Sequence, residues 1–384
     1  MNPKFKLIKT WRCRDGDQEA EKGKAHEERE TTRQTIKMTV LLGLSAAWLA
    51  GTAALAAIDP PGGVGGAPSP DRQLLGVVLT TGHLRARIVD NTDRFCPLGD
   101  SMMPGYNGLA ALIDSGQGRN IVTPAGLNYE SCRTAPKLGQ RQDLWNAPRL
   151  APMIIERLDA RTARLSQKGA DAAGLNVEIV FNLGETYVDQ TITEWPDTDI
   201  ESSYTFWASY MNLVQNTSLF LHGALKDDKE ARWLEMTSAG HNGSGTGTFF
   251  RPCDPTGKTW DQFLVDNPVR RQAVIETPES LAATERAGFK MGQMVTFDNF
   301  FFGFVDDHVV LWIFRKPGNG RFNSWISASG SEAVRRPAWD FGIESGLQKA
   351  GERRTYYVRL VYKPYAGVDD VLREVEHFQN PGTP

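Results

Sequence analysis

From Leu74 onward, short runs of alternating apolar and polar residues follow one another along the chain. LLGVVLTTGHLRARIVD predicts two strands divided near Gly82, and MIIERLD and ARLSQKG predict a hairpin around the turn at residues 160–162. LNVEIVFNL and ETYVDQTITEW repeat this pattern on either side of Gly184. A period of two residues, with many Val, Ile, Thr and aromatic side chains, is typical of β-strands.

The same pattern continues toward the carboxyl end, and helical periodicity is rare. Further strands are expected at residues 202–211, 218–223, 294–305, 308–314, 322–329 and 355–364. Helices are expected only at 277–287 and 368–378, where apolar residues recur every three to four positions. No repeat of 20 to 50 residues is present, which disfavours propellers and solenoids. The pattern predicts an all-β fold, a large antiparallel β-sandwich with a few short helices.

An apolar run, TVLLGLSAAWLAGTAALAA, occupies residues 39–57 and contains no charged residue. Arg33 and Lys37 precede it, and the small-residue triplet at 54–56 has the A-x-A form of a cleavage site. This layout is typical of a secretory signal and predicts a secreted or periplasmic protein, with no membrane association after cleavage. The alternative is a membrane anchor that is retained, because the run has the length of a minimal transmembrane helix.

These features divide the chain into four parts. Residues 1–57 form a leader with the signal segment, of which residues 1–32 are left out of the fold prediction. Residues 58–73 form a Pro/Gly-rich linker. Residues 74–365 form the β-sandwich domain, and residues 366–384 a short C-terminal helix and tail.

Composition excludes some classes of function. The 384 residues carry a formal net charge of −3, and no stripe of Lys and Arg follows the leader, so nucleic acid is not an expected partner. After the leader there are three cysteines, Cys96, Cys132 and Cys253. Either Cys96 and Cys132 form a disulfide, as an oxidising compartment allows, or all three are buried free thiols. No metal-ligand spacing is present, and no metal or cofactor is expected.

Four segments depart from the alternating pattern and are candidates for functional loops. They are residues 118–133, 206–212, 238–257 and 335–341. The glycine-rich stretch in the third segment lacks the Gly-Lys-Ser/Thr ending of a phosphate loop. No G-x-S-x-G sequence is present, which argues against an α/β-hydrolase.

The side chains in and near these segments suit carbohydrate. Aromatic rings stack on the apolar face of a sugar, while Asn, Arg and Glu bind its hydroxyl groups. A His and a carboxyl group can move protons near neutral pH. The candidate catalytic residues are His241, Glu130 and His222, and the candidate substrate-binding residues are Asn128, Arg133, Arg149, Tyr210, Arg251, Trp339 and Asp340.

Each candidate has a structural alternative. His222, at a strand end, is more typical of a hydrogen-bonded structural histidine, whereas His241 lies in a loop of small residues and is the histidine favoured for proton transfer. Trp339 is the candidate stacking platform, and Arg133 or Arg149 the candidate anchor for an anionic or hydroxyl group. A tryptophan of this kind can equally be part of a core.

Five segments, YNGLAALID, GRNIVTPAGLNYE, RLAPMIIERLD, FWASYMN and RRPAWDF, in this order, resemble a group of secreted bacterial proteins of unassigned function. The resemblance extends from about Leu74 to Tyr365 and points to the galactose-mutarotase-like β-supersandwich superfamily. That superfamily includes sugar epimerases, polysaccharide lyases and domains of glycoside hydrolases, which bind carbohydrate on a concave sheet. Its mutarotases use a His and a Glu, but no motif aligns either with this chain, so no catalytic residue is carried over.

Two functions are therefore expected. The first is an exported carbohydrate-active enzyme that uses a histidine and a carboxyl group for acid–base chemistry, as a lyase, an epimerase or a hydrolase. The second is a non-catalytic carbohydrate-binding or cell-surface structural module on the same scaffold. They differ in geometry, because catalysis requires that His241, Glu130, His222 and Asp340 meet in one pocket.

Overall fold

The computed structural model divides the chain into two compact units, Met1–Pro68 and Ser69–Pro384. All residues that the structure describes belong to the second unit. They are residues 76–91, 107–122, 128–134, 148, 152–169, 174–212, 214, 216–225, 228–238, 248–265, 290–292, 295–315, 321–324 and 337–381.

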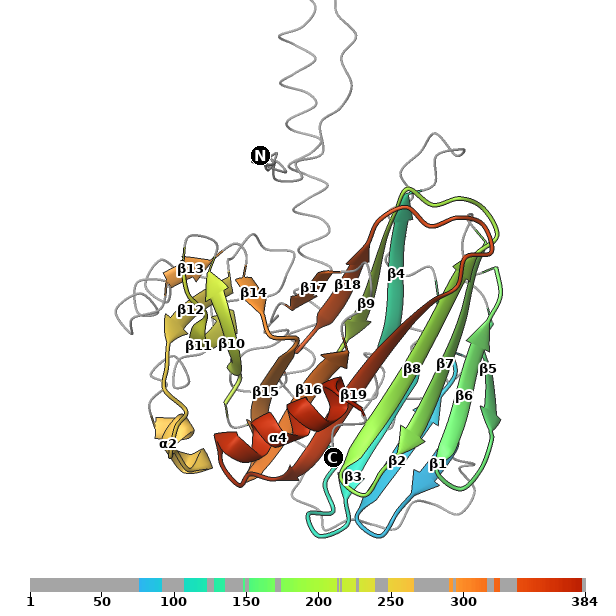
Figure 1. The fold of residues 1–384 in the computed structure, drawn as a ribbon. Helices are drawn as coiled ribbons and strands as arrows, with labels where there is room; N and C mark the ends of the chain where they lie inside the picture. The colour runs from blue at the N-terminus through green and yellow to red at the C-terminus, as the bar shows by residue number, and fades with distance from the viewer. Residues whose placement is uncertain are drawn as a thin grey trace, which may run out of the picture. The chain divides into compact units, whose positions relative to one another are not determined.

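The described strands form three antiparallel sheets, of which one is much larger than the others (Figure 1). In spatial order, the large sheet contains β13 (Lys290–Gly292), β12 (Thr248–Pro252), β11 (Arg232–Ser238), β10 (Leu219–Leu225), β15 (Phe300–Val305), β16 (His308–Arg315), β19 (Arg354–Pro364), β8 (Tyr187–Pro196), β7 (Leu175–Leu183), β6 (Thr162–Gln167) and β5 (Ile154–Arg157). β14 (Val295–Phe297) also pairs with β10.

The two smaller sheets pack against one face of the large sheet. One has the order β17 (Arg321–Ser324), β18 (Phe341–Ser345), β9 (Ser202–Ala208) and β4 (Asn128–Thr134). The other contains β1 (Val77–Thr80), β2 (Leu84–Val89) and β3 (Gly108–Asp114). Buried residues of all three sheets belong to one hydrophobic cluster, so the sheets share a core.

Side-chain alternation explains why these segments are strands. In β8, every second residue is buried over its whole length, as expected for a strand with one face toward the core. The central strands β15 and β16 are almost entirely apolar because both of their faces are covered. In β16, Val310, Trp312 and Phe314 join the core between the sheets, while Val309, Leu311 and Ile313 face the opposite side.

Two helices cover the opposite face of the large sheet. The C-terminal helix α4 (Val368–Gln379) buries Val371, Val375 and Phe378 in a second cluster, together with Phe263 of the short helix α2 (Trp260–Val265). The side chain of Arg315 on β16 donates hydrogen bonds to the carbonyl oxygen of Phe378, which fixes the end of α4. Figure 1 shows α4 lying across β15, β16 and β19.

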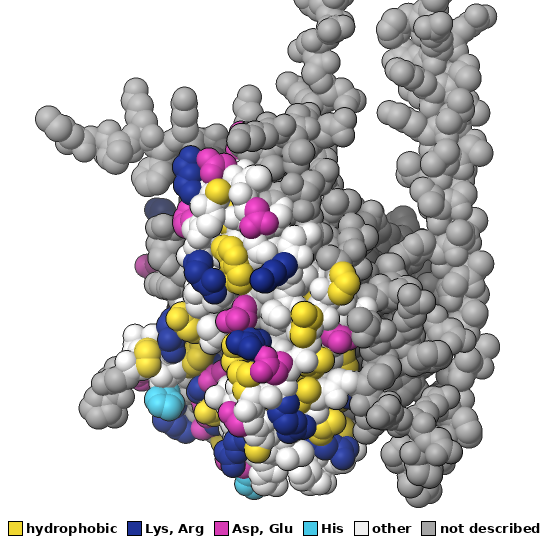
Figure 2. Space-filling view, turned by 90° about the vertical axis from the view of Figure 1, so that its right-hand side faces the viewer, with side chains coloured by type: hydrophobic (Ala, Val, Ile, Leu, Met, Phe, Trp, Pro, Cys, Tyr) yellow, Lys and Arg dark blue, Asp and Glu magenta, His cyan; other side chains and the backbone are white. Residues whose placement is uncertain are grey.

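The outer surface near β5, β6 and β7 carries interspersed cations and anions (Figure 2). Arg164 forms ion pairs with Glu156 at 2.5 Å and with Glu178 at 3.7 Å. Charges of both signs therefore lie side by side on this face.

The all-β prediction is confirmed, and most predicted strands are present within a few residues of their expected bounds. The C-terminal helix is also present. Two of the predicted functional loops were wrong in part. Residues 128–133 of the first belong to strand β4 at the edge of its sheet, and Phe341, the last residue of the fourth, is the first residue of β18.

The signal segment, the linker and the expected helix at 277–287 lie outside the described residues. In the part of the chain that is described, no helix has the length and apolar character needed to cross a bilayer.

A buried carboxyl group links the large sheet to the β4–β9 pair. Glu194 of β8 has no exposed surface. The hydroxyl of Tyr129 on β4 donates a hydrogen bond to Glu194 Oε1 at 2.6 Å, and the hydroxyl of Thr205 on β9 lies 2.8 Å from the same oxygen. Burying a carboxyl group is costly unless donors satisfy it, so Glu194 holds both strands of the smaller sheet in place.

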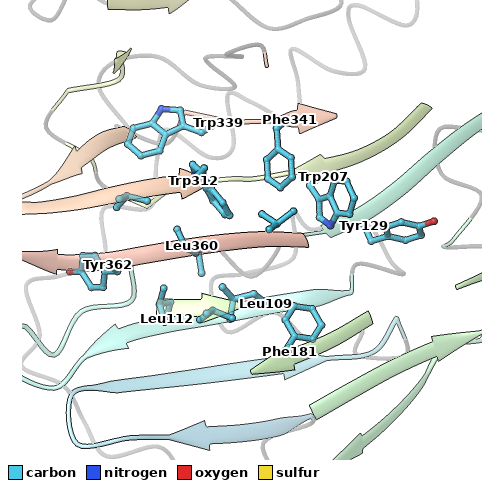
Figure 3. Packing of buried hydrophobic residues seen from close by; sticks show 14 of the residues in the cluster. Leu109, Leu112, Tyr129, Phe181, Trp207, Trp312, Trp339, Phe341, Leu360 and Tyr362 are labelled. Carbon is cyan, nitrogen blue, oxygen red and sulfur yellow. The ribbon is translucent and has the colours of Figure 1, made fainter. Parts of the chain in front are cut away.

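A second link comes from a tryptophan that packs on a glycine. Trp339, which precedes β18, is fully buried, and its indole Nε1 donates a hydrogen bond to the carbonyl oxygen of Thr217 at 3.1 Å. A methyl group at Gly303 of β15 would overlap the six-membered ring of Trp339. Figure 3 shows Trp339 at one end of a group of buried aromatic residues that includes Trp312, Phe341 and Trp207.

We predict that Tyr129→Phe destabilises the protein by about 1–3 kcal/mol, because it removes a donor from a buried carboxyl group while keeping the ring. Chemical denaturation measures the change. Tyr357→Phe is the matched control, since Tyr357 is 37% exposed, and it should stay within about 0.5 kcal/mol of wild type. Equal stability of the two variants would contradict the role given to Glu194.

We predict that Gly303→Ala destabilises the protein by about 1–3 kcal/mol, because the added methyl group displaces Trp339 from a closely packed site. Tryptophan fluorescence and thermal unfolding measure the effect. Gly351→Ala is a useful comparison, since a Cβ there meets no neighbour but the backbone has φ of +73°, so its cost is conformational. Unlike Gly351→Ala, the Gly303→Ala variant should show a changed tryptophan emission as well as a lower stability.

Candidate functional site

The β4–β9–β18 sheet carries two carboxyl groups on the face that points away from the core. Tyr129, Trp207 and Phe341 are paired in one row across the three strands, and all three are buried in the core. Because neighbouring side chains in a strand point to opposite faces, Glu130 points to the other face. Asp340 immediately precedes β18, between Trp339 and Phe341, which both belong to the core cluster, so its side chain also points away from that cluster. The core row therefore places both carboxyl groups on the same side of the sheet.

Asp340 is 3% exposed, and its Oδ1 accepts a hydrogen bond from the backbone N–H of Ser209 at 2.7 Å. Burial raises the pKa of Asp340 to about 8, against an ordinary value of 3.8. The hydrogen bond from Ser209 opposes this shift, and the negative charge of nearby Glu130 adds to it. Asp340 is therefore mainly protonated at neutral pH.

Glu130 is itself 5% exposed and lies close enough to Asp340 to act on its titration. Two neighbouring buried carboxyl groups do not both ionise easily, which agrees with the raised pKa of Asp340. A carboxyl group that keeps its proton at neutral pH, beside a second carboxyl group, is an arrangement that acid–base catalysis can use.

Three other predicted residues lie along the same strands. Tyr210 pairs with Ala338, two residues before Asp340, in an isolated bridge. Asn128 and Arg133 are the first and the sixth residues of β4. The backbone of Asn128 pairs with Ala208 and that of Arg133 with Ser203, and the side chains of Asn128 and Arg133 lie outside the described part of the structure.

Other predicted residues do not join this group. His222 of β10 points to the helix-covered face of the large sheet, where its Nδ1 lies 2.7 Å from Asp298 Oδ2 and its ring contacts Trp233. Arg251 of β12 lies on that same face and pairs with Glu235. The expectation that His222 meets Glu130 and Asp340 in one pocket is therefore wrong, because the large sheet separates them.

Trp339 does not fit the role of a sugar-stacking platform. Its ring has no exposed surface and packs on Gly303 within the core. A fully buried ring cannot accept a sugar, so its part in the site is to hold the next residue, Asp340, in place. His241 and Arg149 lie outside the described residues, and their predicted roles stay predictions.

Sequence analysis missed Ser209 and Glu235. The Ser209 contact uses a backbone N–H, which carries no signal in the residue type. Glu235 alternates with apolar Leu234 and Met236 in β11 and looks like a solvent-facing residue, but it is only 2% exposed. Within the described residues, no group of three or more His, Cys, Asp or Glu side chains is placed to hold a metal ion.

Comparisons with known proteins concern the fold. No protein-family model matches the chain, and no curated protein matches it. Among solved structures, a galactose mutarotase-like protein from Lactobacillus casei is 8% identical, with a TM-score of 0.41, and the match covers 75% of this chain and 99% of that one.

Two further structures give similar values. A galactose mutarotase-like protein from Clostridium acetobutylicum is 9% identical, with a TM-score of 0.41 over 75% of this chain and 95% of that one. A galactose mutarotase related enzyme from Lactobacillus acidophilus is 9% identical, with a TM-score of 0.36 over 75% and 97%. These proteins bear the name of the superfamily that the sequence resembles, and no residue's role is taken from them.

We predict that the stability of Asp340→Asn relative to wild type increases with pH. The pKa of Asp340 is raised in the folded state, so wild type loses stability as pH rises from about 4 to about 8, by about 1.4 kcal/mol for each pH unit. The asparagine variant keeps an acceptor for the Ser209 N–H and has no proton to lose.

Urea denaturation of both proteins at pH 4.5, 6 and 7.5 measures the difference. Asp199→Asn is the control, since that carboxyl group is exposed and pairs with Lys349 on the surface. Parallel pH profiles for wild type and Asp340→Asn would show that Asp340 titrates normally.

Proposed function

We propose that this chain is an exported carbohydrate-active protein that catalyses an acid–base step on a glycan or glycoside. The observation that carries the proposal is the buried pair of carboxyl groups, Glu130 and Asp340, in which Asp340 has a pKa of about 8. The sugar class and the export come from the sequence, through its resemblance and its leader.

In this proposal, Asp340 is the proton donor and Glu130 the proton acceptor. Protonated Asp340 gives its proton to an oxygen bonded to the anomeric carbon. This oxygen is either the one that leaves with the aglycone or the ring oxygen whose bond to that carbon breaks. Ionised Glu130 removes a proton from a hydroxyl group, from a water molecule or from a carbon atom of the sugar. Each group then returns to its starting state by exchange with solvent or through the reverse step.

The two groups are held in fixed positions, and since Asp340 is 3% and Glu130 5% exposed, a step on a sugar requires that this face of the sheet opens to the substrate. Asp340 follows Trp339, whose indole is hydrogen-bonded within the core, and it accepts a hydrogen bond from the N–H of Ser209. Glu130 follows Tyr129, whose hydroxyl is hydrogen-bonded to Glu194. Both groups are thus attached to the core through their immediate neighbours. A proton donor and acceptor held on rigid strands lose little free energy to reorganisation during the reaction.

A non-catalytic binding module is the alternative. The two functions can be separated with the mature protein and a panel of glycans, since three product assays cover the reactions considered. Reducing-end release reports hydrolysis, absorbance of an unsaturated uronic acid reports elimination, and a changed anomer ratio reports epimerisation. Binding of a glycan without any of these products would favour the module.

We predict that Asp340→Asn and Glu130→Gln each lower kcat by about 10²–10⁴, because each removes one member of the donor–acceptor pair. The kcat of wild type should fall as pH rises through about 8, where Asp340 loses its proton. This decrease should be absent from the residual activity of Asp340→Asn.

The control is Asp199→Asn, an exposed carboxyl group outside the site, which should keep wild-type turnover. Circular dichroism of every variant checks that a loss of activity is not a loss of fold. Full turnover by a folded Asp340→Asn or Glu130→Gln protein would rule out the proposed pair.

A further inference from the structure

A cavity of about 390 Å³ lies on the helix-covered side of the large sheet, at the ends of β10, β11 and β12. Its lining is formed by Phe220, Glu235, residues 251–254, Lys258 and Phe263. This volume is in the range of small-molecule sites in proteins. Phe220 belongs to the cluster under the helices, so the cavity and the Glu130–Asp340 pair are on different sides of the sheet.

A charged pair forms one wall of the cavity. Phe220, Glu235 and Arg251 are paired in register across β10, β11 and β12 and therefore share one face. Nε and Nη2 of Arg251 lie 2.7 Å and 2.5 Å from Oε2 of Glu235, which is 2% exposed. A buried ion pair adds little stability compared with apolar residues of the same size, so stability alone does not account for this one.

A second cation and two aromatic rings complete the lining. Nζ of Lys258 lies 5.7 Å from the ring centroid of Phe263. The rings of Phe263 and Phe220 meet edge to face, with centroids 4.7 Å apart. The cavity thus has cationic groups on Arg251 and Lys258 and an apolar wall formed by two phenylalanines.

The charges around the cavity favour a ligand with one negative charge. Arg251 and Lys258 are positive, Asp254 is negative, and its pKa is lowered chiefly by the N–H of Thr256. Burial raises the pKa of Glu235, and burial raises the pKa of the Cys253 thiol to about 12, so that thiol is neutral. Arg251 and Lys258 can together hold one carboxylate, whereas a dianion would add further negative charge beside Asp254 and Glu235.

We propose that this cavity is a binding site for a small monocarboxylic acid with an apolar body. The carboxylate binds between Arg251 and Lys258, and the apolar body lies against Phe220 and Phe263. Arg251 is oriented by Glu235, which holds its Nε–Nη2 edge. This site is separate from the proposed acid–base pair and does not depend on its activity.

Titration calorimetry on the full chain tests the proposal, with benzoate as the probe and benzamide as its uncharged counterpart. We expect benzoate to bind with one site per chain and benzamide to bind at least tenfold more weakly. Glucuronate and inorganic phosphate are the other arms. Glucuronate is also a monocarboxylic acid, and its sugar ring has an apolar face. Its binding through the same residues would therefore support the proposal. Equal affinity for benzoate and benzamide, or phosphate binding alone, would overturn the proposal.

Lys258→Met is the diagnostic variant, because methionine keeps much of the apolar side chain and removes the charge. We expect it to weaken benzoate binding at least tenfold and to leave benzamide binding unchanged. Lys349→Met is the matched control, since Lys349 is a surface lysine paired with Asp199, outside the cavity. Unchanged benzoate affinity in Lys258→Met would overturn the proposal.

A double variant guards against misfolding at the buried pair. Glu235→Gln with Arg251→Gln replaces both charges together and leaves no single charge buried, unlike a change of Arg251 alone. It should keep the wild-type circular dichroism spectrum and lose at least tenfold in benzoate affinity. A folded double variant with wild-type affinity would contradict the site.

Discussion

The position of the small β4–β9–β18 sheet depends on the buried carboxyl group of Glu194. A carboxyl group without exposed surface costs several kcal/mol if it lacks donors, so the structure is favourable only when Tyr129 and Thr205 reach it. Apolar contacts are less directional than hydrogen bonds, so they define the relative position of two sheets less sharply. The hydrogen bonds to Glu194 therefore fix the register between the two sheets.

Glu130 and Asp340 are positioned through the residues that precede them in the chain. Glu130 follows Tyr129, and Asp340 follows Trp339, whose ring occupies the space that Gly303 leaves open. In each case a core residue is anchored on the large sheet and the next residue points to the opposite face. Because side chains alternate between the two faces of a strand, packing of one residue in the core defines the position of its neighbour on the opposite face. Burial of Asp340 lowers stability at neutral pH, and this cost is the source of its raised pKa.

Sequence could predict the elements because each local pattern depends on one face of one strand. β7 was predicted with its observed bounds, since apolar residues alternate from Leu175 to Leu183. β4 was mistaken for a loop, because NYESCRT is mostly polar and only Tyr129 marks its inner face. Of the site, Glu130 and Asp340 were named and were required to meet for catalysis, but no local pattern in the sequence predicts their proximity. It arises because both flank β9, and strand order depends on contacts distant in the sequence. For the same reason His222 was grouped with residues from which the large sheet separates it.

The Glu130–Asp340 pair and the Glu235–Arg251 pair each contain a buried carboxyl group, but the free-energy cost of burying it is offset in different ways. This difference determines which function each pair suits. At Asp340 the cost is met by keeping a proton, which leaves a group able to give that proton away. At Glu235 a guanidinium group lies in direct contact, so the pair is suited to holding an ion rather than to transferring a proton. The charge of Arg251 favours the ionised form of Glu235 and so opposes the effect of burial on its pKa. Chemistry is therefore expected at the β4–β9–β18 sheet, and binding without chemistry at the cavity beside β10–β12.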